Sequence, residues 1–294
     1  MRTLAATGEK SWRRWFTSIT VKKVHLKTMI ASDIQAGRFA KHQSFPKNDV
    51  GRDIVVGDIH GYFSILQTAL EEINFDPQFD RLFALGDLVD RGPNSPAALE
   101  WLRKPWFHSV IGNHDLSHAL EAEREHISNF WILDMIVSTK DDWAASCAPE
   151  VYADLVAEFS RLPLAITIET SRGIVGLVHA ELPHGYPTWS SFIEAIGTES
   201  IDDNTLWMAT WDRFLDLRPV KSRDDLKFFV PDVLAIFHGH SIPWFKEPMK
   251  VGNRYYIETG AYVRARTGRD EGGFTLVDIE HPNEPILAAW WPDE

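Results

Sequence analysis

Side chains that can bind metal ions follow short apolar runs at five places in this chain of 294 residues. They are carboxylates, imidazoles and one amide, in the segments Asp58-Ile59-His60, Asp87, Asn113-His114-Asp115, His179 and His238-Gly239-His240. Any one of these segments alone would be typical of a turn or of a structural histidine. Together they form a donor set without cysteine, which suits Mn, Fe or Zn in an open site better than a closed structural zinc site.

The spacing of these donors favours a site for two ions. An Asp-x-His pair at a strand end, such as Asp58 and His60, can place two side chains on the same ion. Asp87 can bridge two ions through its two carboxylate oxygens, and Asn113 adds a neutral oxygen. A site with so few negative ligands stays positive enough to hold a phosphate group.

The elements that must position these donors are three strand–helix units. Apolar runs at 54–56, 82–85 and 106–111 predict strands, and the patterns at 62–73, 96–103 and from residue 115 predict helices. Sites in parallel α/β sheets form outside the carboxyl ends of the strands, where these donors lie. Helices are then predicted at 117–138 and 150–161. Short strands are predicted at 164–168, 173–178, 233–237, 254–257, 274–279 and 286–290.

Three glycine-flanked motifs resemble the signatures of the phosphoprotein phosphatase family. GDIHG at 57–61, GDLVDRG at 86–92 and GNHD at 112–115 are similar to its GDxHG, GDxVDRG and GNH[ED] patterns. His179 and the turn Gly239-His240-Ser241 stand where that family has its remaining ligands, and the stretch at 256–261 is similar to its phage lambda and bacterial members. The resemblance implies an α/β metallophosphoesterase fold, with a central sandwich of two mixed sheets and helices on both outer sides.

The same resemblance implies two ligand sets that share one carboxylate. The first divalent ion would be held by Asp58, His60 and Asp87, and the second by Asp87, Asn113, His179 and His240. The ions would lie about 3.5–4 Å apart and share a hydroxide that attacks phosphorus in line. The bacterial members imply Mn²⁺, and the ligands also suit Fe and Zn.

The resemblance also assigns the proton donor and the phosphate-binding groups. His114, held by Asp90, would protonate the leaving oxygen. Arg91 would bind phosphate oxygens together with Asn113, and Arg213 matches the second phosphate-binding arginine through a looser motif.

The substrate implied by the resemblance is a phosphoprotein or a small phosphomonoester, hydrolysed by a phosphatase specific for serine/threonine or also for tyrosine. The symmetrical diadenosine tetraphosphate hydrolases are an alternative, because they share the scaffold, the Arg91-Gly92-Pro93 stretch and an aspartate after the GNH motif. Asp90 favours the phosphatases, since those hydrolases have a small residue there. An inactive binding protein is a further alternative, but it would have lost a ligand or His114.

Charge and composition divide the chain at residue 50. Residues 1–50 contain 10 Lys and Arg against 3 Asp and Glu, whereas the whole chain has a net charge of −12. We therefore expect a flexible basic extension over 1–50 and the catalytic domain over 51–294, with a docking or regulatory arm as the alternative for the extension. The acidic body argues against a nucleic-acid partner.

Hydrophobic runs and the cysteine count indicate in which cellular compartment the protein is expected. No apolar run approaches the ~20 residues of a membrane-spanning helix. A single cysteine, Cys147, is typical of a reducing compartment and predicts a cytoplasmic protein. No pattern indicates an oligomeric state.

Overall fold

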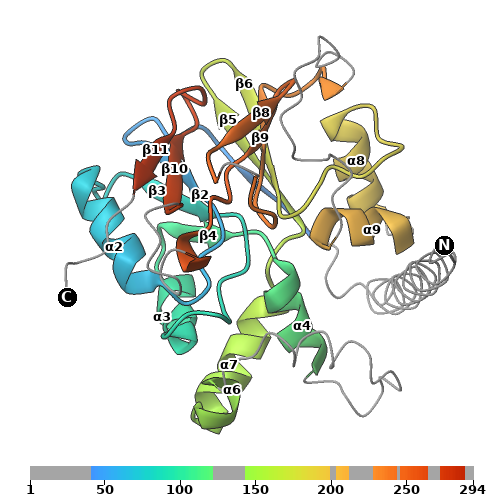
Figure 1. Ribbon diagram of the computed structural model, residues 1–294. Helices are drawn as coiled ribbons and strands as arrows, with labels where there is room; N and C mark the ends of the chain where they lie inside the picture. Colours follow the sequence, from blue (N-terminus) through green and yellow to red (C-terminus); the bar gives the residue numbers. More distant parts are fainter. Residues whose placement is uncertain are drawn as a thin grey trace, which may run out of the picture.

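The computed structural model describes residues 41–121, 143–198, 203–211, 228–243, 246–263 and 272–288. Two mixed β-sheets pack face to face, and helices lie on both outer sides of the pair (Figure 1). This arrangement confirms the predicted α/β sandwich. Within the described part of the chain, no helix has both the length and the apolar character that crossing a membrane requires.

The five-stranded sheet carries the first half of the predicted site. In spatial order its strands are β11 (Ile286–Ala288), β10 (Phe274–Asp278), β2 (Asp53–Val56), β3 (Arg81–Ala84) and β4 (Phe107–Ser109). β2, β3 and β4 are parallel, whereas β10 is antiparallel to β2. The crossovers contain α2 (Phe63–Glu72), the 3₁₀ helix η1 (Ser95–Ala97) and α3 (Ala98–Leu102). Parallel strands need such helical crossovers, which leave their three carboxyl ends at one edge.

The six-stranded sheet supplies the other half. In spatial order its strands are β1 (His42–Phe45), β5 (Ala165–Thr170), β6 (Gly173–Val178), β7 (Ala235–His238), β9 (Arg254–Tyr256) and β8 (Met249–Val251). β6, β7 and β9 are parallel to one another. Their carboxyl ends therefore also share one edge, as the site requires.

Strand β1 lies inside the range that the sequence assigned to a flexible extension. It pairs with β5 in parallel register, from His42 opposite Ala165 to Phe45 opposite Ile168. Phe45 also packs edge-on against Phe83, with ring centroids 5.0 Å apart. These residues thus form an edge of the domain, while residues 1–40 lie outside the described residues.

The remaining helices form two groups. α4 (Asn113–Glu121), α6 (Trp143–Ser146) and α7 (Pro149–Phe159) lie together on one side of the sandwich, and α8 (Trp189–Gly197) and α9 (Asp203–Thr210) on another (Figure 1). The helix predicted at 117–138 corresponds to α4 as far as Glu121, and its remainder lies outside the described residues. The prediction at 150–161 matches α7, which has proline at its start.

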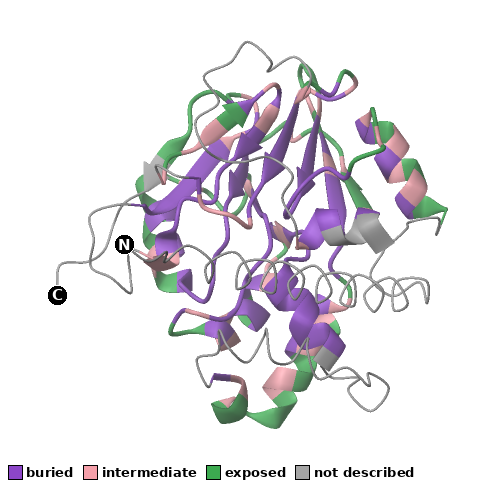
Figure 2. Ribbon diagram, turned by 45° about the vertical axis from the view of Figure 1, so that its right-hand side comes forward, coloured by how far each residue is buried: buried purple, intermediate pink, exposed green. Residues whose placement is uncertain are grey.

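Alternating side chains along the central strands belong to two separate cores. Val55 and Phe83 join residues of the second sheet, such as Phe237, in the core between the sheets. Their neighbours Ile54 and Leu82 instead join the core beneath the helices. Figure 2 shows buried residues along most of the length of these strands. Strands covered on both faces are continuous apolar runs, which explains why the sequence located them.

Glycines allow the loops after β3 and β4 to touch. Gly86 has φ +92°, and a Cβ atom there would lie 2.5 Å from the backbone nitrogen of Gly112. A Cβ on Gly112 would overlap both the backbone nitrogen and Oδ1 of Asp87. Only glycine at 112 therefore allows Asp87 to lie against the start of α4.

Gly112→Ala is expected to destabilise the fold by about 1–3 kcal/mol, because the added methyl group overlaps backbone that cannot move freely. Thermal unfolding by calorimetry measures the effect. The matched control is Gly197→Ala at the end of α8, where a Cβ would meet nothing within 4 Å. That control should leave the unfolding temperature unchanged or raise it. Equal unfolding temperatures for the two variants would contradict the proposed close packing.

Candidate metal centre

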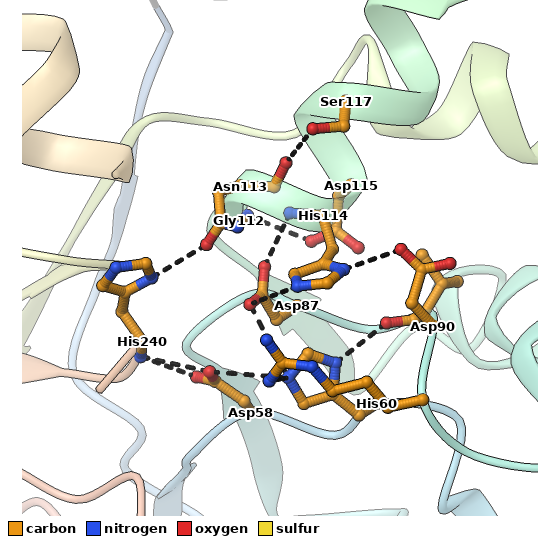
Figure 3. A network of polar contacts seen from close by, with 12 residues as sticks. Asp58, His60, Asp87, Asp90, Gly112, Asn113, His114, Asp115, Ser117 and His240 are labelled. Atoms are coloured by element: carbon orange, nitrogen blue, oxygen red, sulfur yellow. Dashed lines mark hydrogen bonds and ion pairs between the residues drawn. The ribbon is translucent and has the colours of Figure 1, made fainter. Parts of the chain in front are cut away.

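The loops after five strands bring the predicted ligands into one cluster. Asp58 follows β2, Asp87 follows β3, Asn113 opens α4 after β4, His179 follows β6 and His240 follows β7. In Figure 3 the side chains of Asp58, Asp87, Asn113 and His240 point toward one another. Both aspartates are only 1% exposed. Carboxylates buried to this degree need charge partners, so their convergence identifies a candidate cation site.

Two groups of three donors have the geometry of metal sites. His60, Asp87 and His114 form one group, and Asp87, His179 and His240 form the other, with the ligand atoms of each group within 4.8 Å of one another. Asp87 belongs to both, as a bridging carboxylate would. Buried nitrogen and oxygen donors without thiolate fit divalent Mn, Fe or Zn.

The first group contains His114 where the sequence predicted Asp58. Asp58 nevertheless lies beside this group, because its Oδ2 is 3.9 Å from Nε2 of His60. Its carboxylate accepts the backbone N–H of His240 at 3.0 and 3.1 Å, which ties the two sheets together. The assignment of six ligands stays a prediction: Asp58, His60, Asp87, Asn113, His179 and His240.

Backbone carbonyls fix the orientation of two imidazoles. Nδ1 of His60 lies 2.9 Å from the carbonyl oxygen of Val89, and Nδ1 of His179 lies 2.6 Å from that of Leu85. Each Nδ1 must therefore carry the proton, which leaves Nε2 as a metal-binding atom. The Nε2 atoms of His60 and His179 lie 3.7 and 3.5 Å from the carboxylate oxygens of Asp87.

The electrostatics of the cluster favour a neutral imidazole at His60 and a charged carboxylate at Asp87. Burial, and then the positive charge of Arg91, hold the pKa of His60 well below its usual range. Burial opposes charge on Asp87, but the imidazoles of His179, His114 and His60 outweigh it and lower the pKa of that carboxyl. Neutral histidine and ionised aspartate are the forms that bind metal ions.

Asn113 completes the second group with an amide oxygen. Its Oδ1 lies 2.9 Å from Nε2 of His179 and 2.8 Å from Nδ1 of His240. Three donor side chains from three different loops thus face one point.

Backbone strain is concentrated in the same loops. Among the described residues, seven other than glycine have positive φ, and five of these are His60, Asp87, Asp90, Arg91 and His240. Such conformations cost roughly 1–3 kcal/mol each and persist only where the surroundings enforce them. The fold therefore holds these side chains in place against the local preference of the chain.

Asp90 and His114 form a buried ion pair at the edge of the cluster. Nδ1 of His114 donates to Oδ2 of Asp90 at 2.6 Å, while its Nε2 faces Oδ2 of Asp87 at 3.9 Å (Figure 3). Burial lowers the pKa of His114, but the charge of Asp87 and the bond to Asp90 outweigh it and raise that pKa overall. A protonated imidazole held in this way can donate a proton from Nε2.

Only one of the two arginines predicted to bind phosphate lies in the described part of the chain. Nη1 of Arg91 donates to Nε2 of His60 at 2.6 Å, and its guanidinium lies 4.4 Å from the ring centroid of Tyr262. Arg91 is thus beside the predicted ligands, as expected. Arg213 lies outside the described residues.

Several residues that contact Arg91 or Asp90 belong to no recognisable sequence motif. Tyr262 packs on Arg91, and His118 and Trp143 donate to Asp90. His118 alone had a usable signal, because it follows His114 by four residues on one helix face. Trp143 comes from a separate helix, which sequence spacing does not reveal.

Two further buried carboxylates hold the loops rather than face the cluster. Asp115 accepts the backbone N–H groups of Leu88 and Gly112 at 2.9 and 3.0 Å. Glu258 accepts those of Asp58 and Gly260 at 2.9 and 2.8 Å. Burial raises the pKa of each of these carboxyl groups to about 7. Both tie one site loop to another.

A buried cluster of candidate metal ligands at the strand ends of a two-sheet sandwich is the arrangement expected of a metal-dependent hydrolase. Residues 52–243 match the family described as calcineurin-like phosphoesterase. The match spans more than half of the chain, so the chain belongs to this family, whose members are metallophosphoesterases that hydrolyse phosphoester bonds.

Named relatives fall into two groups. Over 226 residues the chain is 31% identical to "Serine/threonine-protein phosphatase 2" of Salmonella typhimurium, which covers 73% of this chain and 90% of the relative. It is 26% identical over 251 residues to the symmetrical bis(5'-nucleosyl)-tetraphosphatase of Nitrosococcus oceani, covering 76% and 86%. A solved structure of a candidate diadenosine tetraphosphatase has a TM-score of 0.55 at 20% identity, covering 87% of this chain and all of that one. This structural similarity shows a shared fold and nothing more specific.

Asp87→Asn is expected to weaken binding of both metal ions together, by at least about tenfold each, because one bridging carboxylate serves both groups. Metal content per chain, measured by inductively coupled plasma mass spectrometry after dialysis, is the readout. Asp154→Asn, on the exposed side of α7, is the control and should keep the wild-type content. A variant at position 87 that retains the full content would disprove the shared-ligand assignment.

Proposed function

We propose that this metallophosphoesterase is a phosphomonoesterase that acts on phosphoserine and phosphothreonine in proteins, and also on phosphotyrosine. The observation that carries the proposal is the 2.6 Å contact between His114 and Asp90. It supplies a proton donor that the two candidate reactions need to different degrees.

The leaving groups of the two reactions differ in basicity. A serine or threonine alkoxide is a strong base and leaves readily only when it is protonated. The nucleotide released from diadenosine tetraphosphate is a far weaker base and needs less help. General-acid catalysis contributes about 10²–10⁴-fold to rate, so an enzyme of alkyl phosphates gains most from a buried, charge-paired donor.

Each residue of the cluster has a distinct role in this proposal. Arg91, with its planar guanidinium, binds two phosphate oxygens, and Asn113 donates to a third through its amide nitrogen. Nε2 of His114 passes its proton to the leaving oxygen, while Asp90 stays ionised and keeps the imidazole aligned. Arg213 is proposed as a second phosphate-binding arginine. The two divalent ions, when bound, supply activation of water and stabilise the charge that develops on the phosphate.

The second candidate, hydrolysis of symmetrical dinucleoside tetraphosphates, rests on the relative with that activity and on Asp115 after His114. Asp115 is fully buried and both of its oxygens accept backbone N–H groups. It therefore has no free oxygen for a substrate, and it does not favour a nucleotide over a phosphoprotein. The similarity to the bacterial serine/threonine phosphatase supports the first candidate.

We propose Mn²⁺ as the native ion and the cytoplasm as the location. The mixed donors of the cluster suit Mn²⁺ as well as Fe or Zn. The one cysteine of the sequence is unpaired, as is usual in a reducing compartment.

A substrate panel tests the proposed function directly. Apo-protein reconstituted with Mn²⁺ is expected to hydrolyse p-nitrophenyl phosphate and a phosphoserine peptide at least about tenfold faster than diadenosine tetraphosphate. The proton donor serves the basic alkoxide that phosphoserine releases, and p-nitrophenyl phosphate is a phosphomonoester whose leaving group departs with little help. Steady-state kcat/KM for each substrate is the measurement. The opposite order would transfer the protein to the dinucleotide hydrolases.

His114→Ala tests the proton donor. We expect kcat for a phosphoserine peptide to fall by about 10²–10⁴-fold, with a much smaller loss for p-nitrophenyl phosphate, whose leaving group needs little protonation. His281→Ala, at an exposed position in the turn after β10, is the control and should behave as wild type. Equal losses on the two substrates would argue against general-acid catalysis by His114.

A further inference from the structure

Asp90 collects more hydrogen-bond donors than pairing with His114 requires. Its second oxygen, Oδ1, lies 3.0 Å from Nε2 of His118 and accepts from Nε1 of Trp143 at 2.7 Å. Its backbone N–H donates to Oγ of Ser95 at 2.9 Å. Asp90 and His118 are fully buried, and Trp143 is 8% exposed. At this depth the two bonds on Oδ1 fix the carboxylate group, and the bond to Ser95 fixes the backbone of Asp90.

The direction of each bond follows from the chemistry of the partners. The bonds from His114 and His118 outweigh burial and hold the pKa of Asp90 below its usual range, so this carboxylate only accepts. Nε2 of His118 must therefore carry a proton. Nδ1 of a neutral His118 is then an acceptor, and it lies 3.0 Å from the hydroxyl of Tyr152, which donates to it. Tyr152 thereby selects the tautomer that serves Asp90.

We propose that His118, with its tautomer set by Tyr152 and with Trp143 as a second donor, is a positioning residue that aims the proton-donating imidazole of His114 through Asp90. This inference rests on the proposed function, since it concerns the proton transfer to the leaving group. The resulting chain of bonds runs from Tyr152 to His118, Asp90 and His114, and we call it the Asp90 network, with Trp143 included.

The geometry explains why one bond to His114 would not be enough. A carboxylate with a single partner can turn about its Cβ–Cγ bond and swing the imidazole with it. Donors on Oδ1 from His118 and Trp143 hold the carboxylate plane, so Oδ2 can meet His114 from only one direction. Misplacing a reacting group by about 1 Å can cost 10²-fold in rate.

The Asp90 network also packs as a set of rings. The ring centroid of His118 lies 5.0 Å from that of Trp143 and 5.8 Å from that of Tyr152. These rings come from α4, α6 and α7, so removing one would loosen the helices as well as the hydrogen bonds. A decisive test must therefore remove polar atoms and keep ring volume.

The variants His118→Gln, Trp143→Phe and Tyr152→Phe meet that need, with His118→Ala as the full deletion. Gln reaches Asp90 with an N–H donor, whereas Phe at 143 and 152 keeps the ring and loses only the polar atom. Tyr255→Phe is the matched control, because its hydroxyl donates to Asn283 in the turn between β10 and β11, outside the Asp90 network. Bound Mn²⁺ and unfolding temperature are measured for every variant.

For the phosphoserine peptide, kcat should fall by about 10- to 100-fold in His118→Ala and less in Trp143→Phe and Tyr152→Phe. KM and metal content should stay near wild type, p-nitrophenyl phosphate should be affected much less, and His118→Gln should regain most of the rate. Losses that are equal for both substrates, or no rescue by Gln, would overturn the inference.

Nitrogen NMR of the imidazole rings gives a readout that does not depend on activity. His118 should show the tautomer protonated at Nε2, and Tyr152→Phe should shift its Nδ1 signal while Tyr255→Phe should not. A proton on Nδ1 of His118 would overturn the inference. Wild-type protein that hydrolyses no phosphomonoester would instead overturn the proposed function, and the inference with it. An active wild type with unaffected network variants would overturn the inference alone.

Discussion

Repulsion between buried carboxylates is the constraint on which the rest of the site depends. Asp58, Asp87, Asp90, Asp115 and Glu258 are all at most 2% exposed and lie in neighbouring loops. Charges removed from water in this way are stable only with nearby positive charge or several hydrogen bonds.

The loops satisfy that requirement by aiming backbone N–H groups at the carboxylates. Asp58 accepts the N–H of His240, and Asp87 accepts that of His114 at 2.8 Å. Asp115 and Glu258 each accept two. Asp90 differs, since its oxygens accept from side chains. The carboxylates therefore shape the loops, and Asp58 and Asp87 keep oxygen lone pairs of the kind that a divalent ion needs.

The strained backbone of these loops is a cost of the same arrangement. The sandwich can bear it because its central strands are buried on both faces, and burial contributes about 25 cal/mol per Å² of apolar surface. The strain therefore lies in the loops of the site, whereas the stability comes from the buried strands. Gly112 shows how narrow the tolerance is, since a single methyl group there would overlap Asp87.

The sequence predicted those parts of the fold and site that depend on local pattern. β2, β3 and β6 were located within a residue or two because their runs are apolar throughout, and the candidate ligands because each follows such a run. β1 was missed because His-Gln-Ser-Phe has no apolar run, and its pairing with β5 is a tertiary contact.

The contacts of Asp90 were missed for a related reason. His118 and Trp143 lie 28 and 53 positions from Asp90 in the sequence, and no local pattern marks contacts across such distances. Sequence motifs identify residues that touch a substrate or a metal ion more readily than residues that orient them.

The choice between a phosphoprotein and a dinucleotide substrate depends on these orienting residues more than on the metal ligands. Both candidate reactions would use the same two ions and the same proposed bridging ligand, Asp87, so the ligand set does not separate them. Asp115 does not separate them either, because its oxygens are committed to the backbone. Two helices, α4 and α6, instead direct three side chains at Asp90, and of these the imidazole of His114 also faces the cluster. Holding one proton donor with this many hydrogen bonds helps a basic leaving oxygen to depart and helps a nucleotide leaving group little. This difference is the strongest physical reason to expect an alkyl phosphate as the substrate.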